Sequence, residues 1–429
     1  MQYIKKDLGS FNLHMIKTDK FKTITIKMAF HSPIKKEEIT KRNILSDILL
    51  QSTLKYSSKR DMIIESEELY ALDIYNNIER LGNYIMTSFI MQVLNDKYTE
   101  EGNFEKALEF LSEIIYHPDV KDNCFKEDKL DIVKNNMDVH LSSIKEDASS
   151  YSIIRLKEAY DKDHPASYRM MGYKEDLDEI NTSNLYQYYK KMIEDDFVDI
   201  YVVGDFEFEE LLILIKKYFK FRKVKRKKLD YEVEHKPCRK RRLIAKEVND
   251  NSQSKLGIIC PINKMKKYEK NYPLVLGNII FGGGPDSKLF KEIREKNSLC
   301  YSIYSIYSKL DNMFLITAGI DKDNFDKTLE LSTNILEKLK KGKFSDKDIK
   351  VAKELYKTAI MSIEESPMEL IKEYLSEEVL GLDNYNDRLE IMNKVTKSEI
   401  VKAFKKIKMD TVFLLEGDKD ENNWVKGTR

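Results

Sequence analysis

The sequence predicts an α+β protein with two tandem similar domains, each a mostly antiparallel sheet packed against helices. Three observations carry this prediction: the chain repeats itself, each repeat mixes long amphipathic helices with short apolar strands, and turn-forming residues are scarce. Only 15 glycines and 8 prolines occur among the 429 residues, which argues against a many-turned sandwich. The length is enough for about two or three domains.

The repeat is clearest in two amphipathic helices. The segment NFEKAL at 103–108 recurs as NFDKTL at 324–329. Apolar residues then follow at matching positions in both copies, with the spacing of one helix face. A second helical segment follows each copy, beginning at Phe125 in the first half and at Phe344 in the second.

Each half also opens with a strand candidate and closes with a helix that leads into another strand. The opening strands are ITIKMAF at 24–30 and KLGIICPI at 255–262. The closing strands are DIYVVGD, which ends at Asp205, and TVFLLEGD, which ends at Asp418. Because four matched segments keep the same order, we expect two α+β domains of about 200 residues each.

The domain boundaries follow from the repeat and from a basic connection between its copies. We predict an N-terminal domain at 1–220, a linker at 221–250 and a C-terminal domain at 251–429. The densest basic stretch, at 216–243, could contact an acidic partner or nucleic acid, or it could be a solvated connection or a basic helix end. With 74 Lys and Arg against 73 Asp and Glu, we favour the solvated connection and predict no nucleic-acid partner.

Cysteine usage and the absence of long apolar segments predict a soluble, cytoplasmic protein. No C-x-x-C pair occurs, so neither a zinc ribbon nor a disulfide framework is supported. The start MQYIKKDLGSFNLHMIK lacks the features of a signal peptide, and no apolar stretch approaches the ~18 residues of a membrane span. The four cysteines are far apart in the sequence: Cys124, Cys238, Cys260 and Cys300.

Common catalytic patterns are absent from the sequence. No two of the six histidines lie within five residues of each other, so no helical turn can offer two imidazoles to a metal. The glycine segment that ends at Lys288 lacks the spacer of a phosphate-binding loop, and no G-x-S-x-G occurs. Cys300 has no basic partner nearby in sequence, which favours an inert core thiol.

One segment stands out because three consecutive glycines occur in a glycine-poor chain: Gly282, Gly283 and Gly284. They predict a loop where side chains are excluded or where φ must be positive. Pro285 and Asp286 then suit the start of a helix. The following LCYSIYSIYS alternates as a strand, and a hairpin at 309–312 leads into MFLITAGI.

Here the sequence resembles the insulinase/pitrilysin-type zinc metallopeptidases. His164-Pro165 with Gly172 resembles the end of that family's N-terminal domain, so the resemblance covers nearly the whole chain. It is closest to the non-catalytic, YfmF-like members that are grouped as elongation factor P modification-associated proteins and accompany a zinc-bearing sister protein. The family's glycine-rich motif is matched at Gly282–Gly284, Ser287, Leu289-Phe290, Arg294–Lys296, Leu299 and Tyr301-Ser302.

The resemblance implies a role for Arg294 and Tyr301, because these family positions reach the active site of the other domain. A guanidinium can grip peptide carbonyls or carboxylates, and a phenol can donate to the oxyanion of a tetrahedral intermediate. The alternatives are a surface helix arginine near Glu292 and Glu295 and a half-buried strand tyrosine. The resemblance favours substrate binding and transition-state support.

The same comparison predicts that the metal site is lost. Active members carry His-x-x-Glu-His on their first helix, and the matching positions here hold Asn43, Ser46 and Asp47. The last glutamate ligand falls near Asn135-Asn136. One amide and one carboxylate cannot replace two imidazoles as zinc ligands, and a serine cannot act as the general base. We therefore expect no metal and no catalytic residue in this chain, which should be inactive alone.

These inferences predict the non-catalytic subunit of a heterodimeric zinc peptidase. A zinc-bearing homologous subunit would be the partner, and a peptide would be the substrate. The three glycines can line a substrate site because bare backbone leaves room and donors for an extended peptide. The alternative is a peptidase-like scaffold or peptide-binding protein with no role in proteolysis, since fold does not imply function. A peptidase with an unrecognised site is disfavoured by the lack of ligands.

Overall fold

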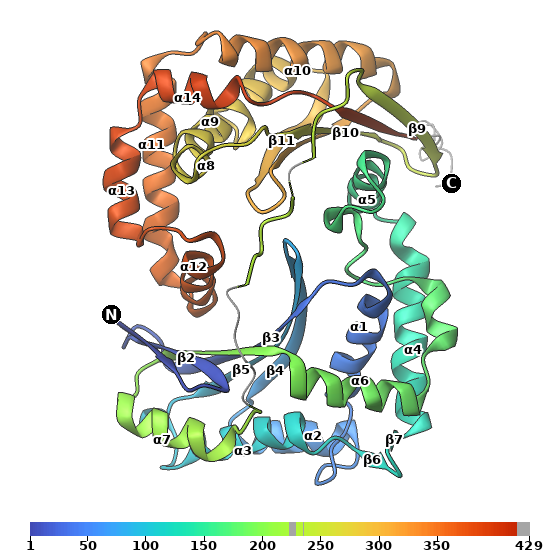
Figure 1. Ribbon diagram of the computed structural model, residues 1–429, viewed down its shortest axis with the longest axis vertical. Helices are drawn as coiled ribbons and strands as arrows, with labels where there is room; N and C mark the ends of the chain where they lie inside the picture. Colours follow the sequence, from blue (N-terminus) through green and yellow to red (C-terminus); the bar gives the residue numbers. More distant parts are fainter. Residues whose placement is uncertain (223–228, 235, 418–429) are drawn as a thin grey trace, which may run out of the picture. The chain divides into compact units, whose positions relative to one another are not determined.

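The computed structural model describes residues 1–222, 229–234 and 236–417 (Figure 1). The chain forms two compact units, each assembled from segments that are separated in sequence. Unit 1 consists of Met1–Ser142, Arg169–Tyr231 and Ile363–Ser376. Unit 2 consists of Ser143–Tyr168, Glu232–Ser362 and the described residues from Glu377 onward. The domain boundaries that we expect from the repeat stay a prediction, and residues 223–228 and 235 of the predicted linker lie outside the described residues.

Unit 1 is built on a six-stranded sheet with the order β1-β2-β8-β3-β5-β4. All neighbouring strands are antiparallel except β2 and β8, which are parallel. A separate two-stranded ribbon is formed by β6 (Val120–Lys121) and β7 (Cys124–Phe125). The strands of the large sheet are β1 (Gln2–Asp7), β2 (Phe11–Lys17), β3 (Thr23–Pro33), β4 (Asp73–Leu81), β5 (Tyr84–Leu94) and β8 (Phe197–Gly204).

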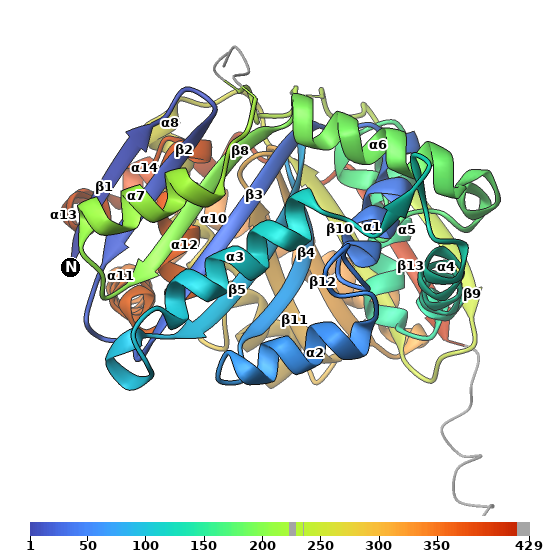
Figure 2. The same cartoon turned by 90° about the horizontal axis from the view of Figure 1, so that it is seen from below.

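The helices of unit 1 that come from the first half of the sequence cover one face of this sheet and enclose its hydrophobic core. Figure 2 shows α3 and α7 along this face, and the core combines their apolar residues with alternate residues of β2, β3, β5 and β8. Helix α12 (Pro367–Leu380) comes from the second half of the sequence, but the rings of Tyr374 and Tyr3 stack at 3.9 Å. The other helices are α1 (Ile39–Ile48), α2 (Lys59–Glu68), α3 (Asn103–Tyr116), α4 (Glu127–Ser142), α6 (Thr182–Asp195) and α7 (Phe208–Tyr218).

Unit 2 is built on a five-stranded sheet with the order β11-β12-β10-β13-β9. Its neighbouring strands are antiparallel except β9 and β13. Strand β11 lies at one edge of the sheet and β9 at the other. The strands are β9 (Leu243–Asn249), β10 (Ser254–Pro261), β11 (Cys300–Ser308), β12 (Met313–Ile320) and β13 (Thr411–Gly417).

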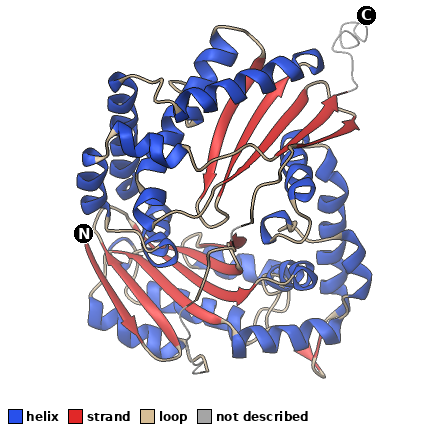
Figure 3. Ribbon diagram, turned by 45° about the horizontal axis from the view of Figure 1, so that its top comes forward, coloured by secondary structure: helices blue, strands red, loops and turns tan. Residues whose placement is uncertain are grey.

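Helices pack against both faces of the unit 2 sheet (Figure 3). Helix α5 (Ala148–Tyr160) covers one face and lies beside β10 in Figure 1, where its Leu156 is fully buried. A Cβ atom added to Gly257 of β10 would lie 2.8 Å from Leu156 Cδ2, so glycine permits this close approach. The remaining helices are α8 (Lys267–Asn271), α9 (Pro273–Gly282), α10 (Phe325–Lys340), α11 (Asp346–Met361), α13 (Tyr385–Lys394) and α14 (Lys397–Phe404).

The predicted fold class is confirmed. The opening strand candidates lie in β3 and β10, which occupy corresponding places in the two sheets, and the repeated helices are α3 and α10. The closing strands are β8 and β13, although Asp418 lies outside the described residues. The repeat in the sequence is therefore a repeat of strand order.

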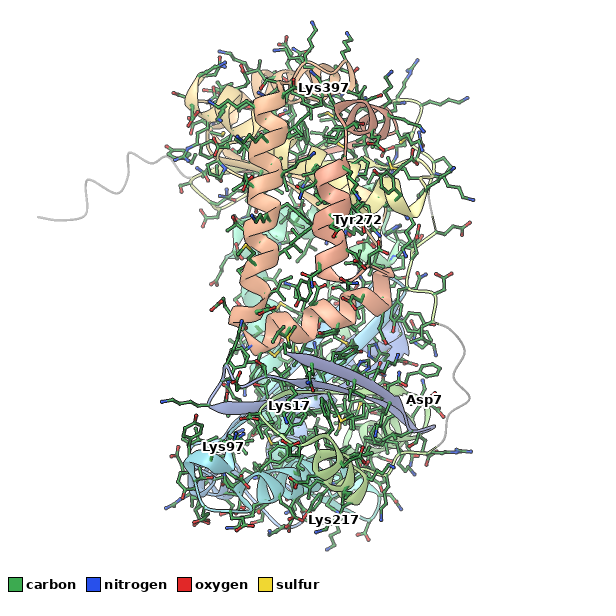
Figure 4. The ribbon with its side chains drawn as sticks, turned by 90° about the vertical axis from the view of Figure 1, so that its left-hand side faces the viewer. Asp7, Lys17, Lys97, Lys217, Tyr272 and Lys397 are labelled. Atoms are coloured by element: carbon green, nitrogen blue, oxygen red, sulfur yellow. The ribbon has the colours of Figure 1, made fainter. Side chains whose placement is uncertain are left out.

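Several charges of the basic stretch are paired with carboxylates. Lys217, labelled in Figure 4, lies in the last turn of α7 and pairs with Glu105 at 2.5 Å. Further along the chain, Arg239 pairs with Asp410. These pairings neutralise part of the described basic stretch. Among the described residues, no helix has the length and apolar character needed to cross a membrane.

A buried polar chain crosses the middle of the unit 1 sheet. Asp199 of β8 lies between two fully buried histidines, 3.5 Å from His14 Nε2 and 3.2 Å from His31 Nε2. Burial alone would raise the pKa of Asp199, but the two histidines hold it well below its usual range. Asn12 also donates to this carboxylate at 2.8 Å. These polar groups thus lie together across three neighbouring strands, β2, β8 and β3.

Helix α1 is held in unit 1 by a buried ion pair. Arg42 is 2% exposed, and its Nη1 lies 2.7 Å from Asp196 Oδ2, while its Nε donates to the Tyr188 hydroxyl at 3.0 Å. Asp196 directly precedes β8 and Tyr188 belongs to α6. The pair therefore joins three elements around the helix on which the family's metal motif would lie.

We predict that Arg42→Ala lowers the free energy of unfolding by about 3–5 kcal/mol, because the Asp196 carboxylate would stay buried without its cation. The control is Lys41→Ala, since Lys41 is the neighbouring cation on α1 and makes no ion pair with the described residues. Chemical denaturation followed by circular dichroism measures both variants. Equal effects of the two substitutions would contradict the anchoring role of Arg42.

Candidate functional site

The positions that match the family's metal motif lie together on α1. The Asn43 amide donates to the carbonyls of Ile39 and Met170, both at 2.9 Å. The Ser46 hydroxyl is buried and donates to the Asn43 carbonyl at 2.9 Å. These side chains are therefore engaged in hydrogen bonds that hold the helix and its neighbouring segment.

Asn76 of β4 joins the same cluster, although nothing in the sequence marked it. Its amide lies 2.8 Å from the Ser46 hydroxyl oxygen and 2.6 Å from the Asp47 carboxylate. Burial raises the pKa of Asp47, although the hydrogen bond from Asn76 and the charges of His140 and Lys59 act in the opposite direction. Because Asn76 is a single polar residue 29 positions from Asp47, only the folded sheet reveals their contact.

This cluster does not fit zinc. Its donors are an amide nitrogen that already donates, a hydroxyl and one carboxylate, whereas zinc sites need thiolate, imidazole or several carboxylate ligands. Among the described residues, no group of three close histidine, cysteine or carboxylate side chains includes an α1 position. Asn135 and Asn136 of α4 are exposed and, being amides, supply no carboxylate.

The three glycines form the end of α9 and the turn after it. None of them has a positive φ, so side-chain exclusion is the one of the two predicted reasons that applies. Side-chain exclusion explains two of them: a Cβ on Gly282 would lie 2.5 Å from Ser305 Oγ, and one on Gly283 would lie 2.8 Å from Ile279 Cα. A Cβ on Gly284 would meet no atom within 4 Å. Only Gly284 therefore leaves open space beside the chain.

The helix after the glycines begins later than the sequence predicts. Pro285 and Asp286 lie in a turn, and helical structure begins at Lys288 because Gly284 and Ser287 first close that turn with a hydrogen bond. The segment Phe290–Glu295 is a π-helix, a wider turn that often occurs at functional sites. The predicted apolar face is present, since Leu289 and Ile293 are fully buried.

Arg294 lies on this π-helix with its charge unpaired. Its guanidinium stacks over the Phe290 ring at 4.7 Å, and it makes no ion pair with the described residues. Glu292, a suggested neighbour, pairs instead with Lys296 at 2.7 Å. Stacking on an aromatic ring leaves the N–H donors in the guanidinium plane available.

Tyr301 begins the edge strand β11 at a β-bulge. Cys300 pairs with Ile320 and Ser302 with Gly319, so Tyr301 is the extra residue of the bulge. Its side chain is 58% exposed, which excludes a half-buried strand tyrosine. Bulges leave a residue out of the ladder and redirect its side chain.

The Cys300 thiol, at the start of the same strand, is near the charge of Arg294. Burial raises the pKa of the Cys300 thiol to about 11, and the nearby positive charge of Arg294 acts to lower it. A thiol with that pKa is almost entirely protonated at neutral pH. The thiol is therefore unreactive, and Arg294 and Tyr301 lie at the same end of β11.

The fold agrees with comparisons to known proteins. The profile of the family described as "Peptidase M16 inactive domain" matches residues 179–356, and M16 is the family of the insulinase/pitrilysin-type peptidases. Over this part of the chain, the protein is similar to the M16 peptidases. The match runs from the residues just before α6 into α11, so it includes the glycine turn, Arg294 and Tyr301.

Individual M16 relatives extend the likeness to nearly the full length. The chain is 27% identical over 419 residues to the probable inactive metalloprotease YmfF of Bacillus subtilis, covering 96% of this chain and 97% of that protein. A conserved protein from Enterococcus faecalis superposes with a TM-score of 0.88 at 27% identity, over 98% and 100% of the two chains. An M16 inactive domain from Pseudomonas fluorescens, at 16% identity, shares the fold with a TM-score of 0.78 over 98% and 99%. The predicted resemblance is confirmed.

We predict that Gly282→Ala destabilises the protein by about 1–3 kcal/mol, because the added methyl group would overlap Ser305 and force β11 away from α9. The control Gly284→Ala should change the free energy of unfolding by less than about 0.5 kcal/mol, since nothing lies within 4 Å of its Cβ. Urea denaturation compares the two. A larger loss for Gly284→Ala would contradict this account of the turn.

A second prediction concerns Asp47. Its pKa is higher in the folded protein than in the unfolded chain, so its carboxylate destabilises the fold at any pH above the unfolded value of about 3.9. Asp47→Asn keeps an acceptor for Asn76 and removes that penalty. The thermal midpoint should therefore rise at pH 7 and stay unchanged near pH 3.

The matched control for Asp47 is Asp131→Asn, because Asp131 is an exposed residue of α4 that makes no ion pair with the described residues. Its midpoint should not change at either pH. A lower midpoint for Asp47→Asn at pH 7 would show that the carboxylate stabilises the fold.

Proposed function

We propose that this chain is the non-catalytic subunit of a two-subunit zinc peptidase. Unit 2 would present Arg294, Tyr301 and the turn at Gly284 to a peptide, and a zinc-bearing homologous subunit would supply the metal and the general base. Both subunits would act in the cytoplasm, where the four free cysteines stay reduced. The likeness to M16 proteins supports the pairing of two related subunits. The hydrogen bonds of the α1 residues support the assignment of metal and general base to the partner.

The main support for the proposal is the exposure and the position of Arg294 and Tyr301. Both are exposed, and both lie at the same end of an edge strand. A structural arginine in this charge-rich chain would be expected to pair with a carboxylate, as Lys288 does with Asp348 at 2.8 Å. Exposed and unpaired groups of this kind are suited to binding another molecule.

The contrast with α1 supports the assignment of catalysis to a partner. Asn43, Ser46 and Asp47 make hydrogen bonds within unit 1 and offer no open metal position. This contrast supports a chain that contributes to peptide binding while a partner contributes the hydrolytic groups. A scaffold with no role in proteolysis would need neither an exposed guanidinium nor a bulged tyrosine at one end of a strand.

We predict that Tyr301→Phe slows peptide cleavage by the assembled pair about 10²-fold or more, because the phenol is the proposed donor to the oxyanion. The matched control is Tyr268→Phe, since Tyr268 is another partly exposed tyrosine of unit 2 whose hydroxyl donates to Glu399. Cleavage is measured with the zinc-bearing subunit at a one-to-one ratio, after size-exclusion chromatography confirms assembly. Unchanged cleavage by Tyr301→Phe would overturn the proposed role and favour the scaffold.

A further inference from the structure

We propose that the outer edge of β11 holds an extended peptide antiparallel to the strand, with the peptide's C-terminal carboxylate on Arg294. This inference rests on the proposed function and adds to it the part of the peptide that is bound. It predicts that the ligand is a chain end with a free α-carboxylate, as in peptide fragments left by an earlier cleavage.

In the described part of its sheet, the outer edge of β11 is not paired with another strand. Among the described residues, β11 pairs only with β12, so its other side presents backbone donors and acceptors without a neighbouring strand. An extended peptide can add to such an edge by main-chain hydrogen bonds. The bulge at Tyr301 ends the regular ladder near the first residue of the strand.

The position of Arg294 sets the direction in which a peptide would run along β11. Strand β11 runs from Cys300 to Ser308. Arg294 lies at the Cys300 end, because its carbonyl accepts from the Ser298 N–H at 3.0 Å in the turn that leads into the strand. A peptide that runs antiparallel to β11 has its C-terminal end at Cys300, whereas a parallel peptide would bring its N-terminal ammonium there. Arg294 attracts a carboxylate and repels an ammonium group, so a bound chain end is favoured in the antiparallel direction.

Arg294 is also the available cation at this end. Lys291 pairs with Asp286 at 2.7 Å, and Lys296 pairs with Glu292. The guanidinium is held by Phe290, and its fixed donors match the two oxygens of a carboxylate. Glu295 also lacks an ion-pair partner among the described residues, but adjacent residues of a helical turn project in different directions.

The side chains of β11 also favour particular residues in the peptide. Ile303 and Ser305 are buried, whereas Tyr304 and Ile306 are 42% and 43% exposed. Side chains alternate between faces along a strand, so Tyr304 and Ile306 lie on one face beside the free edge. Apolar residues at alternate positions of the peptide would pack against them as cross-strand neighbours.

The test is a comparison of two peptides that differ only at the C terminus. We use an N-acetylated hexapeptide of alternating threonine and valine, once with a free carboxylate and once as the C-terminal amide. Isothermal titration calorimetry with the full chain measures both affinities at pH 7. The carboxylate form should bind about 10- to 100-fold more tightly, because hydrogen bonds to a charged group are the stronger ones.

Arg294→Gln should reduce this ratio to about one, while the control Lys291→Gln should preserve it. Equal binding of both peptides by the unmodified chain would overturn the inference, and so would a ratio that survives in Arg294→Gln. If Arg294→Gln weakens both peptides equally, the arginine grips internal carbonyls. The proposed function would then stand, although the C-terminal assignment would fall. Binding of neither peptide would also overturn the inference, and the cleavage assay with Tyr301→Phe would still decide the proposed function.

Discussion

A free sheet edge is the physical constraint on which the functional account of this protein depends. Strand β11 has a partner on one side only, and its outer side displays polar backbone together with Tyr301, Tyr304 and Ile306. Such an edge favours pairing with another chain, and proteins usually blunt it. In β11, a β-bulge at the first residues of the strand interrupts the edge at one end. The edge is regular from Ser302 to Ser308, which leaves room for a single extended segment beside it.

The α1 residues that we aligned with the family's metal motif make hydrogen bonds within unit 1. Asn43 bonds to the segment that contains Met170, and Asn76 bridges Ser46 and Asp47. Hydrogen bonds thus satisfy polar groups at positions where a metal would otherwise do so. The buried pair of Arg42 and Asp196 fixes the same helix from its other side. The M16 fold of unit 1 therefore does not depend on zinc ligands at these positions.

Sequence patterns predicted which segments form helices and strands better than they predicted which of these elements pack together. The repeat located β3 and β10 because their apolar runs match, and it located α3 and α10 because helical periodicity is local. It gave no sign that α5 packs on the sheet of unit 2, or that α12 joins unit 1. Amphipathic helices need a partner, but their sequence does not say which one.

The same distinction applies to single residues of the site. The glycine motif indicated Arg294 and Tyr301, but it could not show that Gly282 is required by Ser305 or that Tyr301 lies in a bulge. Arg42 looks like any surface arginine of a charged helix, and its burial depends on Asp196, which is 154 residues away in sequence. Asn76 and the chain of His14, Asp199 and His31 likewise become visible only when the strands are placed side by side.

The most direct measurement of the central claim is peptide hydrolysis together with bound zinc. Both would be measured for this chain alone, for a zinc-bearing homologous subunit alone, and for their one-to-one mixture. The account predicts zinc on the homologous subunit and hydrolysis that rises strongly only in the mixture. Zinc and hydrolysis in this chain alone would contradict the interpretation of Asn43, Ser46 and Asp47, and a mixture no faster than its parts would contradict the proposed pairing.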